Sequence, residues 1–356
     1  MIYQRLLKPV LFRLDPEVAH HLALDVACLA DIPFVQKLAR AFLHIEHPCL
    51  KVRLFGIEFP NPVGLAAGLD KLCTATSCFD ALGFGAIELG SITAHAQPGN
   101  PKPRMFRLPI DKAIINRMGF PSDGAEAALS NLQRIFARKI KPRAVLGINL
   151  GKTKSAPIDD ALNDYLYSFS KLSAYGDYFV LNVSSPNTPE LRKLQEKSRL
   201  IELFEGVQRV NTSRKPLLVK VSPDLTLDEL DDVLDVALQS GVSGLIATNT
   251  TLSREGVLTP TIETGGLSGA PLRQRSLQMI RRIRRITEGK LPIIGVGGIF
   301  TSDDVVETMK AGADLVQIYT SLVYEGPTLV KRINQGLIAY CQKEGLSSVS
   351  ELSPSA

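Results

Sequence analysis

Residues 179–192 read Phe-Val-Leu-Asn-Val-Ser-Ser-Pro-Asn-Thr-Pro-Glu-Leu-Arg, and this segment decides how the chain is organised. Its first half is apolar and β-branched, as in a strand that is buried on both faces. Its second half holds two prolines and follows no regular period, so the strand must open into a loop. Polar residues that a rigid strand could hold for chemistry cluster at this transition: Asn182, Ser185, Asn187 and Thr188. The alternative is a turn that makes only local backbone hydrogen bonds, and the segment alone favours neither.

A pattern of short apolar strand, loop and helix occurs eight times after a short hairpin about Gly56. The expected strands are 62–67, 85–91, 144–149, 178–183, 217–221, 243–248, 292–296 and 314–319. The expected helices are 73–82, 123–138, 157–173, 198–212, 226–239, 275–287, 302–311 and 326–342. Strict alternation means parallel pairing, and eight units over this length predict an α/β fold, a closed (β/α)8 TIM barrel. An open doubly wound sheet is the alternative, although its glycine-rich turn usually follows the first strand.

Residues 1–45 precede this pattern and are expected to form a small two-helix domain. Asp15-Pro16-Glu17 is a good helix start, with a side-chain cap, a proline and an acid in the first turn. A second helix starts near Pro33, and apolar residues cover most of its circumference. The two helices carry more apolar surface than they can bury in each other, so it must meet a barrel or a bilayer. The expected division is therefore 1–45 as helical domain, 46–345 as barrel and 346–356 as C-terminal tail.

The composition argues against several classes of protein. The net charge of +5 is mild, and basic residues form no block interleaved with aromatics, so nucleic acid is disfavoured. The five cysteines include no CxxC pair, which argues for a reducing compartment and predicts no metal site. Charges interrupt the N-terminus where a signal peptide would have its apolar core. No uncharged apolar run approaches the roughly 18 residues of a spanning helix.

Polar groups recur at the carboxyl ends of the predicted strands, where such barrels carry their chemistry. In chain order these ends hold Ala66–Lys71, Gly90-Ser91, Asn149, Asn182, Lys220, Thr248–Thr250, Gly295–Gly298 and Tyr319-Thr320. A single buried asparagine often only satisfies backbone groups, but a random surface would not place this whole set at corresponding positions. Gly297-Gly298 with Tyr319-Thr320 matches a phosphate cup, because glycines let backbone N–H groups approach phosphate oxygens. Lys220 would face a cofactor ring and could stabilise negative charge on a reduced flavin.

Eight segments, in order along nearly the whole chain, resemble the dihydroorotate dehydrogenase family. They are AAGLDK (66–71), QPGNPKPR (97–104), INRMGF (115–120), NVSSPNTP (182–189), ATNTTL (247–252), TGGLSG (264–269), IIGVGGI (293–299) and LVQIY (315–319). The family oxidises dihydroorotate to orotate in de novo pyrimidine (UMP) biosynthesis, using FMN in a (β/α)8 barrel. Two details resemble its membrane-associated, quinone-dependent class. Ser185 stands at the position of the base, where soluble classes carry cysteine, and residues 1–45 match the extra helical domain.

The resemblance implies a role for each site residue. FMN would be held by Ala67, Gly68, Leu69, Asp70, Lys71, Ser91, Asn149, Asn182, Lys220, Thr248, Gly269, Gly298, Tyr319 and Thr320. Dihydroorotate would be surrounded by Lys71, Asn116, Arg117, Met118, Gly119, Phe120, Asn182, Asn187, Asn249 and Thr250. A lysine complements its carboxylate, and asparagine amides complement its ring N–H and C=O groups. A quinone, ubiquinone or menaquinone, would enter between the N-terminal helices and meet His20, Arg107 and Tyr319, although His20 by itself fits a capped surface histidine better.

The implied reaction makes Ser185 the base that takes a proton from carbon 5, while the hydride on carbon 6 passes to N5 of FMN. Thr188, with Phe120, would form the route by which this proton leaves. Two alternatives stay open: a soluble enzyme that passes electrons to fumarate or NAD, which Ser185 disfavours, and a non-catalytic phosphate-binding barrel that docks a partner protein through residues 1–45. The missing transit peptide and spanning helix favour a bacterium. We therefore expect a monomeric peripheral protein on the cytoplasmic face of the inner cell membrane.

Four departures from the family pattern bear on the loops around the site. Leu72-Cys73 replaces an Asn/Asp-Gly turn, Ser91 a threonine, and Ala94-His95-Ala96 a Pro-basic-Pro stretch. Glu190 replaces the glycine that follows the loop of the base. A residue with a side chain restricts the backbone there, so we expect this loop to be stiffer than in its relatives.

Overall fold

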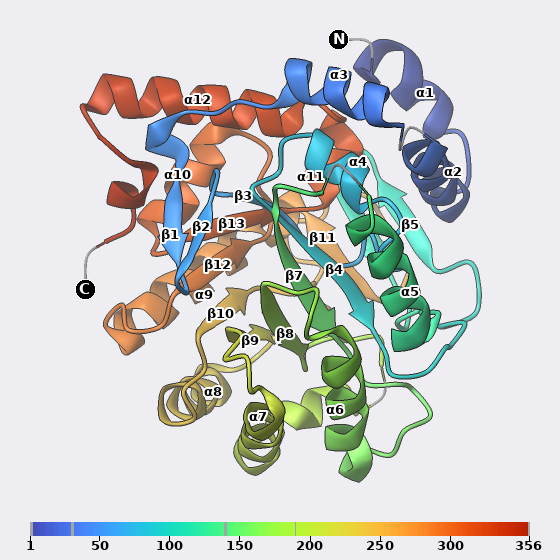
Figure 1. Ribbon diagram of the computed structural model, residues 1–356, viewed down its shortest axis with the longest axis vertical. Coiled ribbons are helices and arrows are strands. Elements are labelled where there is room, and N and C mark those ends of the chain that lie inside the picture. Colours follow the sequence, from blue (N-terminus) through green and yellow to red (C-terminus); the bar gives the residue numbers. More distant parts are fainter. Residues whose placement is uncertain (1–2, 30–31, 139–140, 189, 355–356) are drawn as a thin grey trace.

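Eight parallel strands close into a barrel in the computed structural model, which describes residues 3–29, 32–138, 141–188 and 190–354 (Figure 1). The strands are β3 (Val63–Leu65), β4 (Ala86–Ile92), β7 (Val145–Leu150), β8 (Tyr178–Asn182), β9 (Leu217–Val221), β10 (Gly244–Ala247), β12 (Ile293–Val296) and β13 (Leu315–Ile318). The last strand pairs with the first, with Gln317 opposite Gly64, and this closes the ring. The predicted (β/α)8 barrel is confirmed. Pro189 of the opening segment and the outermost ends of the two terminal segments lie outside the described residues.

The helices between the strands follow the predicted order. They are α4 (Thr76–Ala81), α5 (Gly124–Phe136), α6 (Ala161–Leu172), α7 (Lys197–Val210), α8 (Leu227–Gln239), α9 (Arg273–Thr287), α10 (Ser302–Lys310) and α12 (Leu329–Glu344). Capping boxes start two of them, with Thr226 and Glu229 at α8 and Thr301 and Asp304 at α10. A short helix that was not predicted, α11 (Thr320–Glu325), follows β13 and contacts α12 and β11.

Short 3-10 turns complete the layer around the barrel. They are η2 (Pro48–Leu50), η3 (Ile158–Asp160), η4 (Leu191–Gln195), η5 (Ala270–Leu272) and η6 (Val349–Leu352). The last of these lies in the segment that was expected to be a tail. It buries Val349 and Leu352 against the protein, so this segment packs on the barrel through residue 352.

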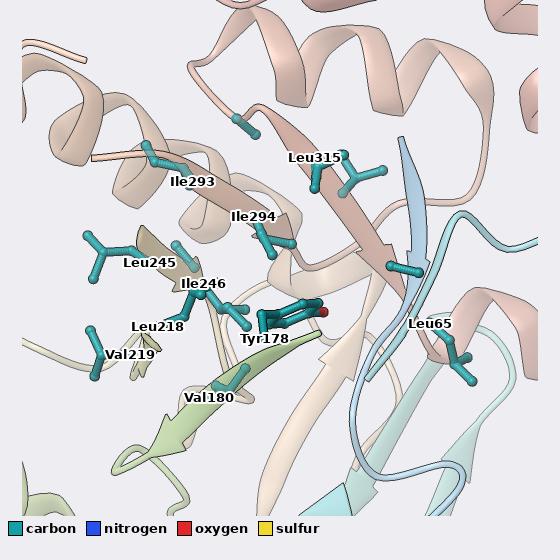
Figure 2. Close-up of a cluster of buried hydrophobic side chains, with 14 of the residues drawn as sticks. Leu65, Tyr178, Val180, Leu218, Val219, Leu245, Ile246, Ile293, Ile294 and Leu315 are labelled. Carbon is teal, nitrogen blue, oxygen red and sulfur yellow. The ribbon is translucent and has the colours of Figure 1, made fainter. Parts of the chain in front are cut away.

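Side chains rather than solvent fill the barrel at the amino-terminal ends of its strands. Tyr178 on β8 is fully buried, and Figure 2 shows Ile246 and Ile294 beside its ring. The neighbouring strand leaves room for this ring at Gly147, where a Cβ atom would lie 2.2 Å from the Tyr178 ring. Side chains fill this end, and the large cavity of the barrel lies at the carboxyl ends of the strands.

A second sheet, which the sequence did not predict, lies over that open end. Its antiparallel strands are β5 (Met105–Leu108), β6 (Ala113–Asn116) and β11 (Gly266–Gly269), in the order β11-β6-β5. The predicted hairpin about Gly56 is present as β1 (Val52–Leu54) and β2 (Ile57–Phe59). The three-stranded sheet joins two barrel loops that are far apart in the sequence and so forms one wall of the ligand site.

The two predicted N-terminal helices are present as α2 (Pro16–Leu29) and α3 (Pro33–Leu43), preceded by η1 (Tyr3–Leu7) and α1 (Lys8–Leu11). The Asp15 carboxylate accepts the backbone N–H groups of Glu17 and Val18 at 2.9 and 3.1 Å, as expected for the cap. In Figure 1, α3 lies at one end of α12, and Lys331 of α12 donates to the Phe42 carbonyl at 2.6 Å. Within the described residues no single helix has the length and hydropathy to cross a bilayer, and α2 with α3 meets that test only as a bent pair.

Candidate functional site

A large cavity opens at the carboxyl ends of the barrel strands, below the three-stranded sheet. Its empty volume is about 1160 Å³, which includes solvent at the open mouth. The structure brings most of the sequence-predicted residues into its wall: Ala67, Gly68, Lys71, Ser91, Asn116, Met118, Gly119, Phe120, Asn182, Ser185, Asn187, Lys220, Thr248, Asn249, Thr250, Gly269, Gly298, Tyr319 and Thr320.

Several predicted residues lie outside this wall. Asp70 is buried and caps the loop before α4, because its carboxylate accepts from the backbone of Thr74 and the hydroxyl of Thr76 at 2.9 Å each. Leu69 packs into the hydrophobic core. Arg117 turns toward Glu263, with Nη1 and Oε2 2.6 Å apart. The structure therefore gives these three side chains supporting positions, and their direct contact with a ligand remains a prediction.

The charge in the cavity comes from two lysines. Lys220 on β9 is buried, and its Nζ lies 3.2 Å from Glu88 Oε1 beneath the cavity floor. Lys71 lies at the opposite side, where burial lowers its pKa to about 8 against the opposing charge of Glu17. None of the described residues that line the cavity is acidic. Such a site favours an anionic ligand.

Side-chain amides form a connected floor between the lysines. Asn182 Nδ2 donates to Ser91 Oγ at 2.9 Å and to Asn149 Oδ1 at 3.1 Å. Asn149 does not line the cavity, since it lies one layer below and is fully buried. On the far wall, Asn187 Nδ2 donates to the Asn116 carbonyl at 3.1 Å, which joins two loops of the predicted substrate site. Amide groups can match the N–H and C=O edges of a ring.

Ser185 lies where β8 opens into its loop, and its side chain lines the cavity. Its Oγ accepts the Asn187 backbone N–H at 3.3 Å, which leaves its own O–H free to turn toward a ligand. Thr188 is buried behind this loop, and its Oγ1 has no hydrogen-bond partner within the described chain. An unpaired buried hydroxyl calls for an explanation, and a relay of protons or a water molecule would supply one.

Glu190 adopts the left-handed backbone conformation that glycine, the usual residue at this position, adopts easily. Its φ of 56° lies in the left-handed region, and its carboxylate pairs with Lys193 at 2.5 Å. Cys73, in the other altered turn, also has a positive φ of 56°. Residues with a Cβ atom adopt this region at a cost, so these two turns carry local strain.

The residues at the predicted phosphate end fit a phosphate group. Gly298 has a φ of +68°, and a Cβ atom there would lie 2.5 Å from Arg273 Cβ, so only glycine leaves its backbone accessible. Ser321 Oγ lines the same end of the cavity, is buried and has no partner within the described residues. Backbone N–H groups and a free hydroxyl are suitable donors for phosphate oxygens.

The three predicted quinone contacts lie in different surroundings. Burial, together with the charge of Lys71, lowers the pKa of His20 to about 3, so this α2 side chain is neutral and lies near the lysine. The Tyr319 hydroxyl donates to the Gly68 carbonyl at 3.4 Å, and burial raises its pKa to about 12. Arg107 donates to the carbonyls of Leu11, at 2.9 Å, and Leu14, so it secures the segment before α2. His20 and Tyr319 thus lie close to the same loop of strand β3, whereas Arg107 serves the helix connection.

Sequence reasoning missed one charged residue of the site. Glu88 lies inside the barrel on β4, is fully buried and accepts hydrogen bonds from Asn149, Lys220 and Gln317. Ser184 and Ser321 were also missed. A signal for Glu88 was present, because one acid interrupts an otherwise apolar strand at a position buried on both faces.

Comparisons with known proteins agree over almost the whole chain. The sequence profile of the family described as dihydroorotate dehydrogenase matches residues 49–340. A relative from Gloeobacter violaceus named dihydroorotate dehydrogenase (quinone) is 49% identical, covering 98% of this chain and 97% of the relative. One of the same name from Acaryochloris marina is 46% identical, covering 99% of this chain and 98% of the relative.

Solved structures give the same result. The crystal structure of DHODH from Eimeria tenella in complex with ferulenol aligns with a TM-score of 0.87 at 37% identity, over 95% of this chain and 94% of that one. The ligand-free form from the same organism aligns equally well, with a TM-score of 0.87. The resemblance in the eight segments is thereby confirmed, and the chain belongs to the dihydroorotate dehydrogenase family.

Proposed function

We propose that this protein oxidises dihydroorotate to orotate with FMN as cofactor and passes the electrons to a membrane quinone. One observation supports this most directly: an acid-free cavity with two lysines, a floor of amides and Ser185 in its wall, on a chain 49% identical to a quinone-dependent relative. Orotate is an anion with amide groups in its ring, and these are the groups that the cavity complements.

Bound FMN would supply the acceptor for the hydride that leaves carbon 6 of the substrate. Its phosphate would be held by Gly269, Gly298 and Thr320, with Ser321 as an additional donor, and Lys220 with Thr248 would contact its ring system. Ala67, Gly68, Lys71, Ser91, Asn182 and Tyr319 would line the remaining contact surface, with Asn149 supporting them from below. All of these lie in or directly under the cavity wall.

The chain's own residues would then bind and deprotonate the substrate. Lys71 pairs with the carboxylate, while Asn116, Asn187, Asn249 and Thr250 bind the ring. Ser185 Oγ takes the proton from carbon 5 as its own hydroxyl proton leaves toward Thr188; this oxygen lines the cavity and accepts the Asn187 backbone N–H at 3.3 Å. Phe120 closes the cavity beside Gly151, and Thr188 Oγ1 provides the next polar atom for the proton.

The N-terminal helices supply the surface for the quinone and the lipid. Large apolar side chains on them are solvent-exposed, among them Leu22, Val26, Phe34, Leu38 and Phe42. An amphipathic surface of this kind lies in the membrane interface, where quinones are dissolved. We therefore propose residues 1–45 as the quinone-access domain of a monomer bound to the cytoplasmic face of a bacterial membrane, and residues 46–345 as the catalytic barrel.

The cofactor and the electron acceptor test this proposal. The protein purified from an overexpressing culture should be yellow, and heat should release FMN, identified by chromatography against FMN and FAD standards. Dihydroorotate should bleach the flavin absorbance, and a ubiquinone or menaquinone analogue should restore it. Restoration by fumarate or NAD, but by no quinone, would show that the acceptor is soluble. A colourless protein that takes up no added FMN would leave only the non-catalytic barrel.

A further inference from the structure

The centre of the barrel holds a carboxylate that none of the proposed roles uses. Glu88 on β4 is fully buried, and three hydrogen-bond donors from three other strands converge on it. Its Oε1 accepts from Asn149 Nδ2 on β7 at 2.7 Å and from Lys220 Nζ on β9 at 3.2 Å. Its Oε2 accepts from Gln317 Nε2 on β13 at 2.6 Å. Figure 1 shows how these strands surround the same interior space.

A carboxylate in this position has two consequences. The first concerns charge. An isolated buried charge costs several kcal/mol, so Lys220 and Glu88 stabilise each other as an ion pair, and the pair as a whole is neutral. A cofactor ring above Lys220 therefore meets a compensated charge rather than a full positive one.

The second consequence concerns the orientation of the side-chain amides. A carboxylate can only accept, so it fixes which end of the Asn149 amide faces it. Asn149 Oδ1 is consequently turned to Asn182 Nδ2, 3.1 Å away. Asn182 Oδ1 in turn faces the Ser184 hydroxyl at 3.1 Å and Asn249 Nδ2 at 3.4 Å.

Asn149, Asn182 and Asn249 form a row of hydrogen-bonded amides, and the orientation of each amide determines that of the next. The last one, Asn249, is a predicted substrate contact, and its Nδ2 also donates to Ser184 Oγ at 2.9 Å. The direction of the hydrogen bonds at the substrate is thus set from inside the barrel, by a carboxylate that lies directly beneath the cavity-lining Lys220.

We propose that Glu88 is a positioning residue for the reaction, which compensates the charge of Lys220 beneath the cofactor and orients the amides of Asn149, Asn182 and Asn249 toward the substrate. This inference rests on the proposed function, since it assigns Lys220 to the flavin. It goes further by stating that the reduction potential of the bound flavin depends on a residue that touches neither cofactor nor substrate.

The test measures the midpoint potential of the bound flavin in a double-mutant cycle of Glu88→Gln and Lys220→Met, each variant loaded with FMN. Glu88→Gln leaves the Lys220 cation uncompensated, so the potential should shift upward, because a positive charge favours the more negative reduced flavin. Lys220→Met leaves the Glu88 anion uncompensated and should shift it downward. The double variant is neutral again and should return toward the wild-type potential. If Glu88 has no electrostatic role, the double variant will instead equal Lys220→Met.

Two further measurements separate positioning from general damage to the fold. Orotate should bind to Glu88→Met roughly tenfold more weakly, the loss typical of one misdirected hydrogen bond, because methionine cannot accept from Asn149, and Glu88→Asp should recover part of it. Gln317→Met is a partial control: it removes one hydrogen bond to Glu88 and one amide from the cavity wall, but leaves the ion pair with Lys220 and the bond to Asn149 intact. Its potential should stay near that of the wild type.

The outcomes are distinct from those of the proposed function. A wild-type protein that binds no FMN would overturn both the function and this inference. A wild-type protein that is reduced by dihydroorotate, with wild-type potential in Glu88→Gln and wild-type orotate affinity in Glu88→Met, would overturn this inference alone. A shift in Gln317→Met as large as that in Glu88→Gln would also overturn it. If Glu88→Gln does not fold, the comparison of Lys220→Met with the double variant still decides the charge effect.

Discussion

Glu17 on α2 and Arg104 beside β5 form a buried ion pair, with Oε1 and Nη2 2.7 Å apart. The same guanidinium donates to the carbonyls of Pro98 and Asn100 at 2.6 and 2.8 Å. Asn100 Nδ2 then donates to the carbonyls of Arg117 and Asn187 at 3.0 and 3.2 Å. The N-terminal domain is therefore connected, through one arginine, to both loops of the predicted substrate site.

Removal of one partner of this ion pair should destabilise the protein strongly, whereas replacement of both partners by apolar residues should destabilise it little. Arg104→Met should lower the free energy of unfolding by about 3–5 kcal/mol, because it leaves a buried carboxylate without its partner. The double variant with Glu17→Met should recover most of that loss. Chemical denaturation of the three proteins measures both effects. A single variant as stable as the wild type would mean that water or Lys102 replaces the arginine.

Acid should weaken the attachment of α2. Burial alone would raise the pKa of Glu17, but Arg104 and Lys102 hold it at about 2. Burial, together with the charge of Lys71, lowers the pKa of His20 from 6.5 to about 3. Both groups bind protons more readily in the unfolded chain, so stability should fall as the pH drops from about 6.5 toward 3. Melting temperatures measured across this range should fall less steeply for His20→Gln, and identical slopes would contradict the burial of that histidine.

Orotate affinity should depend on pH through Lys71. Because the pKa of this lysine is lowered to about 8, the free protein loses the cation above that pH, and the dissociation constant should rise by up to about tenfold per pH unit. Lys71→Arg should bind more weakly but without this dependence, since a guanidinium stays charged. Titration of flavin absorbance between pH 7 and about 9 measures both curves. A flat wild-type curve would exclude Lys71 as the carboxylate partner.

Ser185→Ala should keep the flavin and lose most of the chemistry. Ser185 lies away from the phosphate end, so FMN content should not change, whereas loss of a general base slows reduction by about 10²–10⁴-fold. Ser185→Cys should retain activity with an altered pH profile, because a thiol titrates nearer to neutrality. Stopped-flow reduction by dihydroorotate is the measurement. Wild-type rates in Ser185→Ala would remove this residue from the mechanism.

Membrane binding should depend on exposed aromatic residues of α3. Phe34 and Phe42 are 73% and 64% exposed, so changing both to serine should leave the fold intact while reducing binding to anionic liposomes and turnover with long-chain quinone. Turnover with a small soluble dye should stay at the wild-type level. The matched control is Leu227→Ser on α8, where the leucine is 52% exposed on the barrel. Equal liposome binding by all three proteins would place the membrane contact elsewhere.

Point substitutions are preferable to removal of residues 1–45. Arg40 on α3 forms an ion pair with the buried Asp80, and Glu17 pairs with Arg104. A truncated chain would leave Asp80 and Arg104 without these partners. We still expect such a truncation to bind FMN and to be reduced by dihydroorotate, provided that it folds, but its quinone turnover is meaningful only at full flavin content.

Local pattern was sufficient to predict the barrel. Each strand is a short apolar run, each helix has its own period and caps, and chain order alone then dictates parallel pairing. The strand ends, from Lys71 to Thr320, could be assigned to one site for the same reason, since parallel strands carry their carboxyl ends to one edge. The roles within that site came from the family resemblance and not from periodicity.

What the sequence could not indicate depends on contacts between distant segments. Strands β6 and β11 pair across about 150 residues, with Ile115 opposite Leu267, and neither segment was predicted as a strand. Arg117 and Arg107 were assigned to ligands by the family resemblance, which did not indicate that the Glu263 carboxylate and the Leu11 carbonyl also bind them in the folded protein. Glu88 gained its partners from three other strands. A buried charge is stable only beside an opposite charge or hydrogen-bond donors. For Glu88 these groups come from strands that are distant in the sequence, and only closure of the barrel brings them together.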